Sequence, residues 1–212
     1  MVEQDGQLLR CHVPDPGRLK ELLIPGHDVL LRKLPTQATM KTAGSVVGVY
    51  HAKLKLWVSL DSQLANRFVA DKWNELPTLS SFVEMRREVT FGASRLDFVF
   101  YDGLGQEWLA EVKTVTLVRE SDKTALFPDA PTKRGTRHIK ELTEGVRAGK
   151  KGLVVFVVPR EDATGVSTNR TTDIDFHDAV AQATKTGVTF LCLRCNFSPE
   201  GLLFEREIPF VQ

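Results

Sequence analysis

The chain has 212 residues, of which 42% are hydrophobic and 26% are charged, and its formal net charge is +1. These values are ordinary for a globular protein and exclude a largely disordered chain, while the length suits two domains of modest size. The longest strongly apolar run, at residues 152–158, is far too short to cross a bilayer about 30 Å thick. We therefore expect a cytoplasmic protein that has no membrane partner.

The first sixty residues predict a small β domain. Short strands are expected at 8–13, 27–33, 45–50 and 53–60, and Pro-Gly pairs at 16–17 and 25–26 separate the early ones. A brief helical turn is expected at 17–23. Several short strands with one small helix are typical of a compact barrel or sandwich, a kind of domain that often binds oligonucleotides.

From residue 61 onward the pattern changes to helices alternating with strands. Asp61 and Ser62 can cap a helix that runs through Leu64, Phe68 and Trp73 and ends before Pro77. Further along, strands are expected at 82–90, 95–101, 108–116, 153–158 and 188–194, and helices near 139–146 and at 179–186. Close spacing predicts hairpins among the early strands, and the helix between the two late strands predicts a parallel crossover. The order indicates an α/β (α+β) domain with a mixed sheet.

Two cysteines lie close together in the last predicted strand region. Cys192 and Cys195 have the spacing of half a zinc site, but no second pair or histidine follows at a usable distance. Burial of the thiols in the apolar strand is therefore the favoured interpretation.

Two of the early strands bring acidic residues together. The turn at 102–105 is rich in residues that tolerate positive φ, which suits a hairpin centred near Leu104. Symmetric pairing about Leu104 places Asp97 directly opposite Glu111, with Cβ atoms about 4.5–5.5 Å apart. Because side chains alternate along a strand, Glu111 and Lys113 project from the same face. The sequence thus predicts one patch of Asp97, Glu111 and Lys113.

This patch suits metal-assisted chemistry on phosphate. Two carboxylates at that separation repel one another unless a cation lies between them, and oxygen ligands favour Mg²⁺ or Mn²⁺. Such an ion can polarise a phosphodiester and lower the pKa of a bound water, while Lys113 can stabilise negative charge or assist that water. The alternative is a surface hairpin whose Asp97, Glu111 and Lys113 only pair with one another.

A basic segment follows the patch. Residues 133–151 contain Lys133, Arg134, Arg137, Lys140, Arg147, Lys150 and Lys151, opposed only by Glu141 and Glu144. The start of this helix could present backbone N–H groups and basic side chains to a phosphate, although a solvated helix surface explains the same charges. His138 is the histidine nearest the patch, but a lone histidine on a helix is more often a surface or capping residue.

Several segments resemble the sugar fermentation stimulation protein A family. The resemblance covers nearly the whole chain and is carried by HVPDPGRL (12–19), ELLIPG (21–26), REVTFGASRLDF (87–98), EVKTVTL (111–117) and FPDAPTKRG (127–135). It implies an OB-like β-barrel at residues 1–60 joined to a PD-(D/E)XK nuclease-like domain at 61–212, with DNA as the ligand. That family also begins with a further strand, whereas only a few polar residues precede Leu8 here, so closure of the barrel is left open.

The resemblance also implies roles for individual residues. Asp97, Glu111 and Lys113 match the catalytic positions, and Asp97, Glu111 and the backbone carbonyl of Val112 are the implied ligands of Mg²⁺ or Mn²⁺. Glu88 aligns with an acidic position and is either a further ligand or a salt-bridge partner. Contacts to nucleic acid are expected from Arg18, Arg95, Lys133, Arg134, Arg137 and Lys140. Arg95 could equally pair with a carboxylate, and turn geometry alone could explain the Pro and Gly beside Arg18.

Three functions are compatible with these features. The first is a DNA-binding, metal-dependent nuclease. The second is a non-catalytic DNA-binding regulator of sugar-metabolism gene expression that uses a nuclease fold as a docking surface, and the third is a protein interaction module with structural carboxylates. The intact Asp97, Glu111 and Lys113 favour catalysis, because two opposed carboxylates repel DNA phosphates unless a metal intervenes. The net charge of +1 predicts weak DNA binding at physiological salt. The oligomeric state is left open, a homodimer included.

Overall fold

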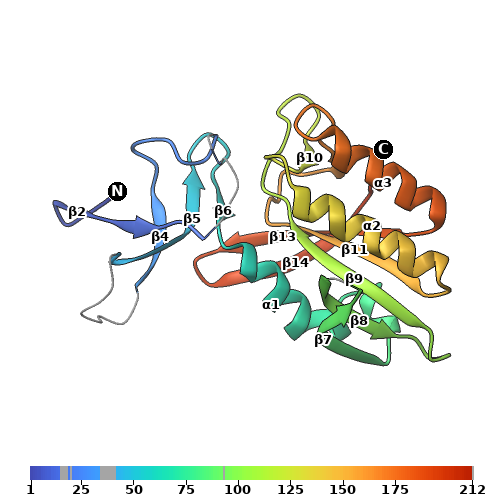
Figure 1. The fold of residues 1–212 in the computed structure, drawn as a ribbon. Helices are drawn as coiled ribbons and strands as arrows, with labels where there is room; N and C mark the ends of the chain where they lie inside the picture. Colours follow the sequence, from blue (N-terminus) through green and yellow to red (C-terminus); the bar gives the residue numbers. More distant parts are fainter. Residues whose placement is uncertain (15–18, 20, 34–41, 93, 212) are drawn as a thin grey trace.

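The computed structural model describes residues 1–14, 19, 21–33, 42–92 and 94–211. Figure 1 shows a small β part at the N-terminal end, drawn in blue to cyan, beside a larger part in which a sheet is flanked by helices. The mixture of helices and strands in the larger part confirms the α/β class expected from the order of periodic segments. No helix among the described residues is long and apolar enough to cross a membrane.

The small part is organised around one long strand. Its strands are β1 (Val2–Gln4), β2 (Gln7–Leu9), β3 (Cys11–His12), β4 (Val29–Lys33), β5 (Gly44–His51) and β6 (Leu56–Ser59). β5 pairs antiparallel with β4 and β6 and parallel with β3, while β1 and β2 form a separate hairpin. Among the described residues every pairing of the β3 to β6 sheet runs through β5, so these ladders leave the sheet open. The expected turn at 17–23 lies partly outside the described residues.

The larger part contains a six-stranded mixed sheet. Its main strands are β7 (Glu84–Phe91), β8 (Ser94–Tyr101), β9 (Glu107–Thr114), β11 (Lys151–Val158), β13 (Thr189–Ser198) and β14 (Gly201–Ile208). Their order is β14-β13-β11-β9-β8-β7. β9, β11 and β13 are parallel, whereas β7, β8 and β14 join at the two edges as antiparallel strands. The predicted early hairpins and late parallel crossover are both observed.

Helices cover both faces of this sheet. The helices are α1 (Ser62–Lys72), α2 (Lys133–Arg147) and α3 (Ile174–Thr186), with two 3-10 turns at Trp73–Glu75 and Leu79–Ser81. Apolar side chains of α2 and α3 share one core with the sheet, which includes the fully buried Ile139 and Phe176. The α1 residues Phe68 and Val69 pack into a second core on the other face. In α2 the predicted apolar stripe lies on the buried side, since Ile139 and Leu142 are buried. In α1 only Phe68 of the predicted stripe is buried, whereas Leu64 and Trp73 are half-buried.

Local signals explain where several elements begin and end. The carboxylates of Asp61 and Asp173 accept hydrogen bonds from backbone N–H groups in the first turns of α1 and α3, as N-caps do. α3 ends at Gly187, whose φ of 103° lies in the left-handed region that glycine adopts without strain. In the β8–β9 turn, Asp102 Oδ1 accepts hydrogen bonds from the backbone N–H groups of Leu104 and Gln106.

The sequence missed four strands. β1 (Val2–Gln4) lies among the polar residues before Leu8, where no strand was expected. β10 (Thr124–Phe127) and β12 (Gly165–Thr168) pair with each other in a parallel ladder, but four residues each are too few for a visible alternation. β14 is an edge strand whose sequence includes Glu205, Arg206 and Glu207, so its apolar pattern is interrupted by charges.

The two cysteines of β13 are buried, as the sequence favoured. Cys192 and Cys195 are free thiols that are 1% and 0% exposed. Burial in the sheet raises the pKa of each thiol to about 12. Both side chains therefore act as small apolar groups in the core rather than as metal ligands or nucleophiles.

Candidate functional site

The β8–β9 hairpin brings Asp97 and Glu111 together. The ladder pairs Tyr101 with Glu107 and continues to Phe98 with Ala110, in the register predicted from symmetry about Leu104. The ladder ends there, and the same register continued by one residue would set Asp97 opposite Glu111. There the Asp97 Oδ2 atom accepts a hydrogen bond of 2.8 Å from the Val112 backbone N–H, so its carboxylate acts as an acceptor for the neighbouring strand where the ladder ends.

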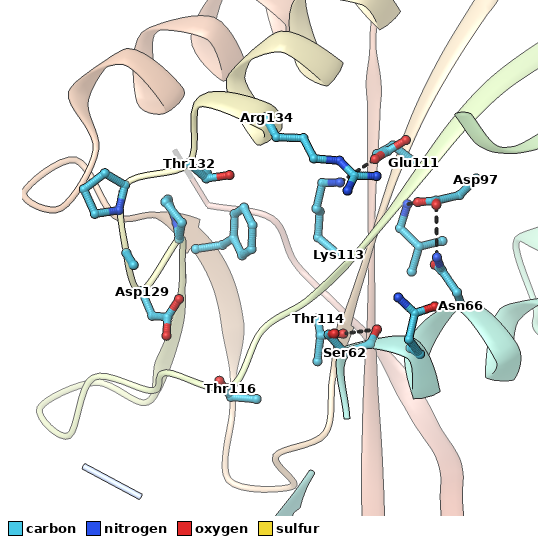
Figure 2. Close-up of a pocket in the computed structure, with 16 residues that line it drawn as sticks. Ser62, Asn66, Asp97, Glu111, Lys113, Thr114, Thr116, Asp129, Thr132 and Arg134 are labelled. Carbon is cyan, nitrogen blue, oxygen red and sulfur yellow. Dashed lines mark hydrogen bonds and ion pairs between the residues drawn. The ribbon is translucent and has the colours of Figure 1, made fainter. Parts of the chain in front are cut away.

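Asn66 of α1 holds the other oxygen of Asp97. Its Nδ2 atom donates a hydrogen bond of 3.0 Å to Asp97 Oδ1, as Figure 2 shows. Helix α1 therefore orients the Asp97 carboxylate of β8. This helix and α2 lie on opposite faces of the sheet. Each oxygen of Asp97 accepts one of these hydrogen bonds and keeps a further acceptor position.

Glu111 is almost completely buried, with an exposed fraction of 2%. Its Oε1 atom accepts a hydrogen bond of 2.5 Å from Lys113 Nζ and a short one from His138 Nδ1. Its Oε2 atom is also buried, yet has no hydrogen-bond partner among the described residues. A buried carboxylate oxygen without a donor is costly, so a group that the structure does not contain would stabilise it.

The two carboxyl groups have pKa values shifted in opposite directions. Burial, and next the charge of Glu111, raises the pKa of Asp97 above its usual range. Burial also acts to raise the pKa of Glu111, but the hydrogen bond from His138 and the positive charge of Lys113 outweigh it and lower that pKa overall. Glu111 therefore loses its proton more readily than Asp97 does.

These residues line a cleft with a volume of about 330 Å³. Figure 2 shows how α1, the ends of β8 and β9, the loop before α2 and the first turn of α2 surround it. The side chain of Arg134 extends from α2 into the cleft beside Glu111 and Lys113. The lining residues are Ser62, Gln63, Asn66, Asp97, Glu111, Val112, Lys113, Thr114, Thr116, Phe127, Pro128, Asp129, Ala130, Pro131, Thr132 and Arg134.

The N-terminal β part reaches the rim of this cleft. Ser62 Oγ donates a hydrogen bond of 3.1 Å to the backbone carbonyl of Pro14, and Thr114 Oγ1 donates one of 3.4 Å to the backbone carbonyl of Ser62. A ligand that is longer than the cleft can therefore contact both parts of the chain.

The basic residues predicted to bind nucleic acid separate into two groups. Arg134 lines the cleft, whereas Lys133, Arg137 and Lys140 are exposed along α2 outside it. Arg137 Nε lies 4.0 Å from Glu141 Oε1, so the negative charge of Glu141 offsets part of the positive charge on this helix surface. Arg18 lies outside the described residues.

Glu88 and Arg95 pair with each other instead of joining the cleft. Arg95 Nε lies 2.6 Å from Glu88 Oε2 across the β7–β8 ladder, and both side chains are well exposed. Neither is among the residues described along the cleft. Glu88 and Arg95 thus form the salt bridge that the sequence left open as an alternative for each of them.

Sequence reasoning underrated His138 and missed Asn66. His138 is 2% exposed and contacts Glu111, so the surface or capping role expected for it is wrong. The available signal was that Arg134 and His138 stand four residues apart, on the same face of one helix. Asn66 gave no signal, because a single polar residue on a helix does not reveal which strand it contacts.

Comparison with known proteins identifies relatives along the whole chain. The family model described as the sugar fermentation stimulation protein RE domain matches residues 60–201, and that described as the SfsA N-terminal OB domain matches residues 1–60. Among curated relatives, a sugar fermentation stimulation protein homolog from Alkaliphilus metalliredigens is 41% identical over 98% of this chain and 88% of its own length. A homolog of the same name from Acetivibrio thermocellus is 40% identical over 100% of this chain and 90% of its own length.

A solved structure supports the same assignment. The SfsA protein of Pyrococcus furiosus, determined in complex with Ca²⁺, matches with a TM-score of 0.84 and 25% sequence identity. The match covers 97% of this chain and 87% of the Pyrococcus chain. The expected α/β architecture with an N-terminal OB domain is therefore confirmed, and the chain belongs to the sugar fermentation stimulation protein family.

Proposed function

We propose that the protein is a DNA-binding, divalent-metal-dependent nuclease of the PD-(D/E)XK type, which hydrolyses phosphodiester bonds at Asp97, Glu111 and Lys113. One observation carries the proposal. Glu111 presents a buried oxygen without a partner among the described residues, beside a second carboxylate and a lysine in a cleft. This arrangement destabilises the protein unless a cation or substrate uses it.

The donor set suits Mg²⁺ or Mn²⁺. Among the described residues no group of three or more His, Cys, Asp or Glu side chains is placed to enclose a metal ion. Mg²⁺ does not need such a group, because it commonly binds one or two carboxylates and completes its shell with waters and substrate phosphates. Asp97, Glu111 and the backbone carbonyl of Val112 are the proposed ligands. The Ca²⁺ complex of the Pyrococcus relative supports this choice, since Ca²⁺ also prefers oxygen ligands.

Beside the metal, three side chains of the cleft would each have a separate role in the reaction. When bound, the metal would supply a polarised phosphate and a water of lowered pKa. Lys113, whose side chain is 15% exposed, would donate hydrogen bonds to the phosphate oxygen on which negative charge develops. Arg134 is suited to bind a second phosphate oxygen, because its guanidinium extends into the same cleft. Asn66 would keep Asp97 in place through its hydrogen bond of 3.0 Å.

DNA would extend beyond the cleft over α2 and the N-terminal part. Lys133, Arg137 and Lys140 form an exposed basic row that can contact phosphates without reading sequence. The contact between Ser62 and Pro14 places the OB domain at the cleft rim, and OB domains often bind oligonucleotides.

The decisive experiment is cleavage of labelled single- and double-stranded DNA with Mg²⁺ or Mn²⁺, with DNA binding measured in parallel. We expect metal-dependent cleavage that Asp97→Asn and Lys113→Ala each reduce at least 100-fold while DNA binding persists. Glu88→Gln is the matched control, because it removes an exposed carboxylate of the neighbouring strand outside the cleft. It should cleave like the wild type.

Two outcomes of the same cleavage and binding assay would contradict the nuclease proposal. DNA binding without cleavage above the background of the Asp97→Asn protein would favour a regulator that uses this fold as a docking surface. Absence of both binding and cleavage would favour a protein interaction module in which the carboxylates are structural.

A further inference from the structure

His138 connects two functional residues of the cleft through the interior of the protein. It lies in α2 with an exposed fraction of 2%, and its ring nitrogens face different partners. Nδ1 contacts Glu111 Oε1, and Nε2 lies 3.4 Å from Nε of Arg134. A buried imidazole therefore stands between Glu111, whose Oε2 atom has no partner in the described part of the chain, and the arginine that extends into the cleft.

The two partners together determine which nitrogen carries the proton. A guanidinium only donates hydrogen bonds, so the contact from Arg134 requires a lone pair at Nε2 of His138. An ionised carboxylate only accepts, so the contact to Glu111 requires a hydrogen at Nδ1. These two constraints select the neutral tautomer of His138 that is protonated at Nδ1.

A neutral donor affects Glu111 differently from a second cation. It fixes the orientation of the carboxylate by a hydrogen bond but leaves the negative charge of Glu111 available to a bound ion. Lys113 and His138 both donate to Oε1, which leaves Oε2 as the oxygen without a donor among the described residues. The imidazole and Lys113 thus act on the same oxygen, and the imidazole helps to determine which carboxylate oxygen is presented.

We propose that His138 is a positioning residue, which holds Glu111 by its Nδ1–H group so that Oε2 is turned toward the divalent ion, and that Arg134 maintains the required tautomer. This inference rests on the proposed metal site, but it makes a claim about the protein before DNA is added. Its consequences can be measured without nuclease activity.

The first test is binding of Mn²⁺ alone, measured by titration calorimetry on the full-length chain. His138→Leu removes the donor and should weaken Mn²⁺ binding about 10- to 100-fold, the usual effect of removing a residue that orients a metal ligand. His138→Asn can place an amide nitrogen near the position of Nδ1 and should bind within a few-fold of wild type. His138→Gln places its amide nearer the position of Nε2 and should bind as weakly as His138→Leu.

Thermal unfolding of the His138 variants without metal shows whether each variant folds, so that a loss of Mn²⁺ binding can be distinguished from a loss of folding. If His138→Leu does not fold, the comparison of Asn and Gln at the same position decides. Equal Mn²⁺ affinity in both, or wild-type affinity in His138→Leu, would overturn the positioning role while leaving the proposed nuclease standing. Wild-type protein that neither binds Mn²⁺ nor cleaves DNA would overturn both.

The second test is the ¹⁵N NMR spectrum of the histidine ring in the metal-free protein. We expect His138 to show a protonated Nδ1 and an unprotonated Nε2, and Arg134→Ala to allow exchange between the two tautomers. A ring protonated at Nε2 in the wild type would contradict the assigned hydrogen bonds and with them the positioning role.

Discussion

At the scale of single residues, the surroundings of Asp97 and Glu111 give these two carboxyl groups different pKa values. Asp97 receives hydrogen bonds from Asn66 and Val112, whereas Glu111 receives them from Lys113 and His138. Both groups are largely buried, but the positive charge of Lys113 is paired directly with Glu111 at 2.5 Å. The opposite pKa shifts of Asp97 and Glu111 follow from this unequal distribution of partners.

This electrostatic coupling can be tested by Glu111→Gln. Burial would still raise the pKa of Asp97, but the repulsion from a neighbouring anion would be absent. We therefore expect the pKa of Asp97 to fall toward its ordinary value, measured by ¹³C NMR titration of the carboxyl carbon without metal. Glu88→Gln, which removes a carboxylate paired with Arg95, should leave that titration unchanged. An Asp97 titration unaffected by Glu111→Gln would mean that the two carboxyl groups do not interact in solution.

At the scale of elements, the start of α1 depends on Asp61. Its Oδ1 atom accepts a hydrogen bond of 3.1 Å from the Gln63 backbone N–H, which caps the helix. Its Oδ2 atom accepts hydrogen bonds of 2.9 Å from Arg32 of β4 and 2.8 Å from Arg67 of α1. One carboxylate thus begins the helix that carries Asn66 and also attaches it to the N-terminal sheet.

Two substitutions separate the cap from the ion pairs. Asp61→Asn keeps a capping oxygen and should cost about 0.5–1 kcal/mol at neutral pH, since both arginines are half exposed. Asp61→Ala removes the cap as well and should cost about 1 kcal/mol more. Urea unfolding measures both differences. Equal stability of the two variants would show that the cap contributes nothing.

The ion-pair contribution should depend on pH. Burial acts to raise the pKa of Asp61, but hydrogen bonds and charges from Arg67 and Arg32 outweigh it and lower the pKa overall. Because the folded-state pKa is depressed, the advantage of wild type over Asp61→Asn is complete above the unfolded pKa of about 4. It is lost as the pH falls through the folded-state value. An advantage that persists unchanged to pH 2 would contradict this assignment.

At the scale of the whole molecule, close packing joins the N-terminal sheet to the large sheet. β6 lies against β13, and a Cβ atom added to Gly48 of β5 would come within 2.7 Å of the Phe197 ring. Phe197 belongs to β13 and is 5% exposed, so its ring cannot move freely into solvent. Glycine at position 48 therefore permits the close approach of the two parts.

Gly48→Ala should lower stability by about 1–3 kcal/mol, because it overpacks this contact. Thermal unfolding measures the effect, and Gly103→Ala is the control, since a Cβ atom there meets nothing within 4 Å. Adding Phe197→Leu to Gly48→Ala should be less harmful than the sum of the two single changes, because the smaller side chain makes room for the new methyl group. Strictly additive effects would show that the two residues do not touch.

Much of the fold, and the pairing of Asp97 with Glu111 in the site, can be predicted from patterns among residues that are close together in the sequence. Helix caps, apolar periodicity and the turn at 102–105 depend on residues close together along the chain, so they predict the helices, the main strands and the register that opposes Asp97 to Glu111. Edge strand β14 and the short strands β1, β10 and β12 were missed, because their residues carry too little apolar alternation to be distinguished from loops.

The sequence by itself determined the α/β class, the hairpin carboxylates and the basic face of α2, since each depends on spacing within one element or one turn. Only the tertiary structure decided that His138 holds Glu111 and that Asn66 holds Asp97, pairs separated by 27 and 31 residues. It also decided that Glu88 pairs with Arg95 outside the cleft. The physical reason is that these contacts depend on how helices are placed against the sheet, and packing of the two apolar cores sets that placement.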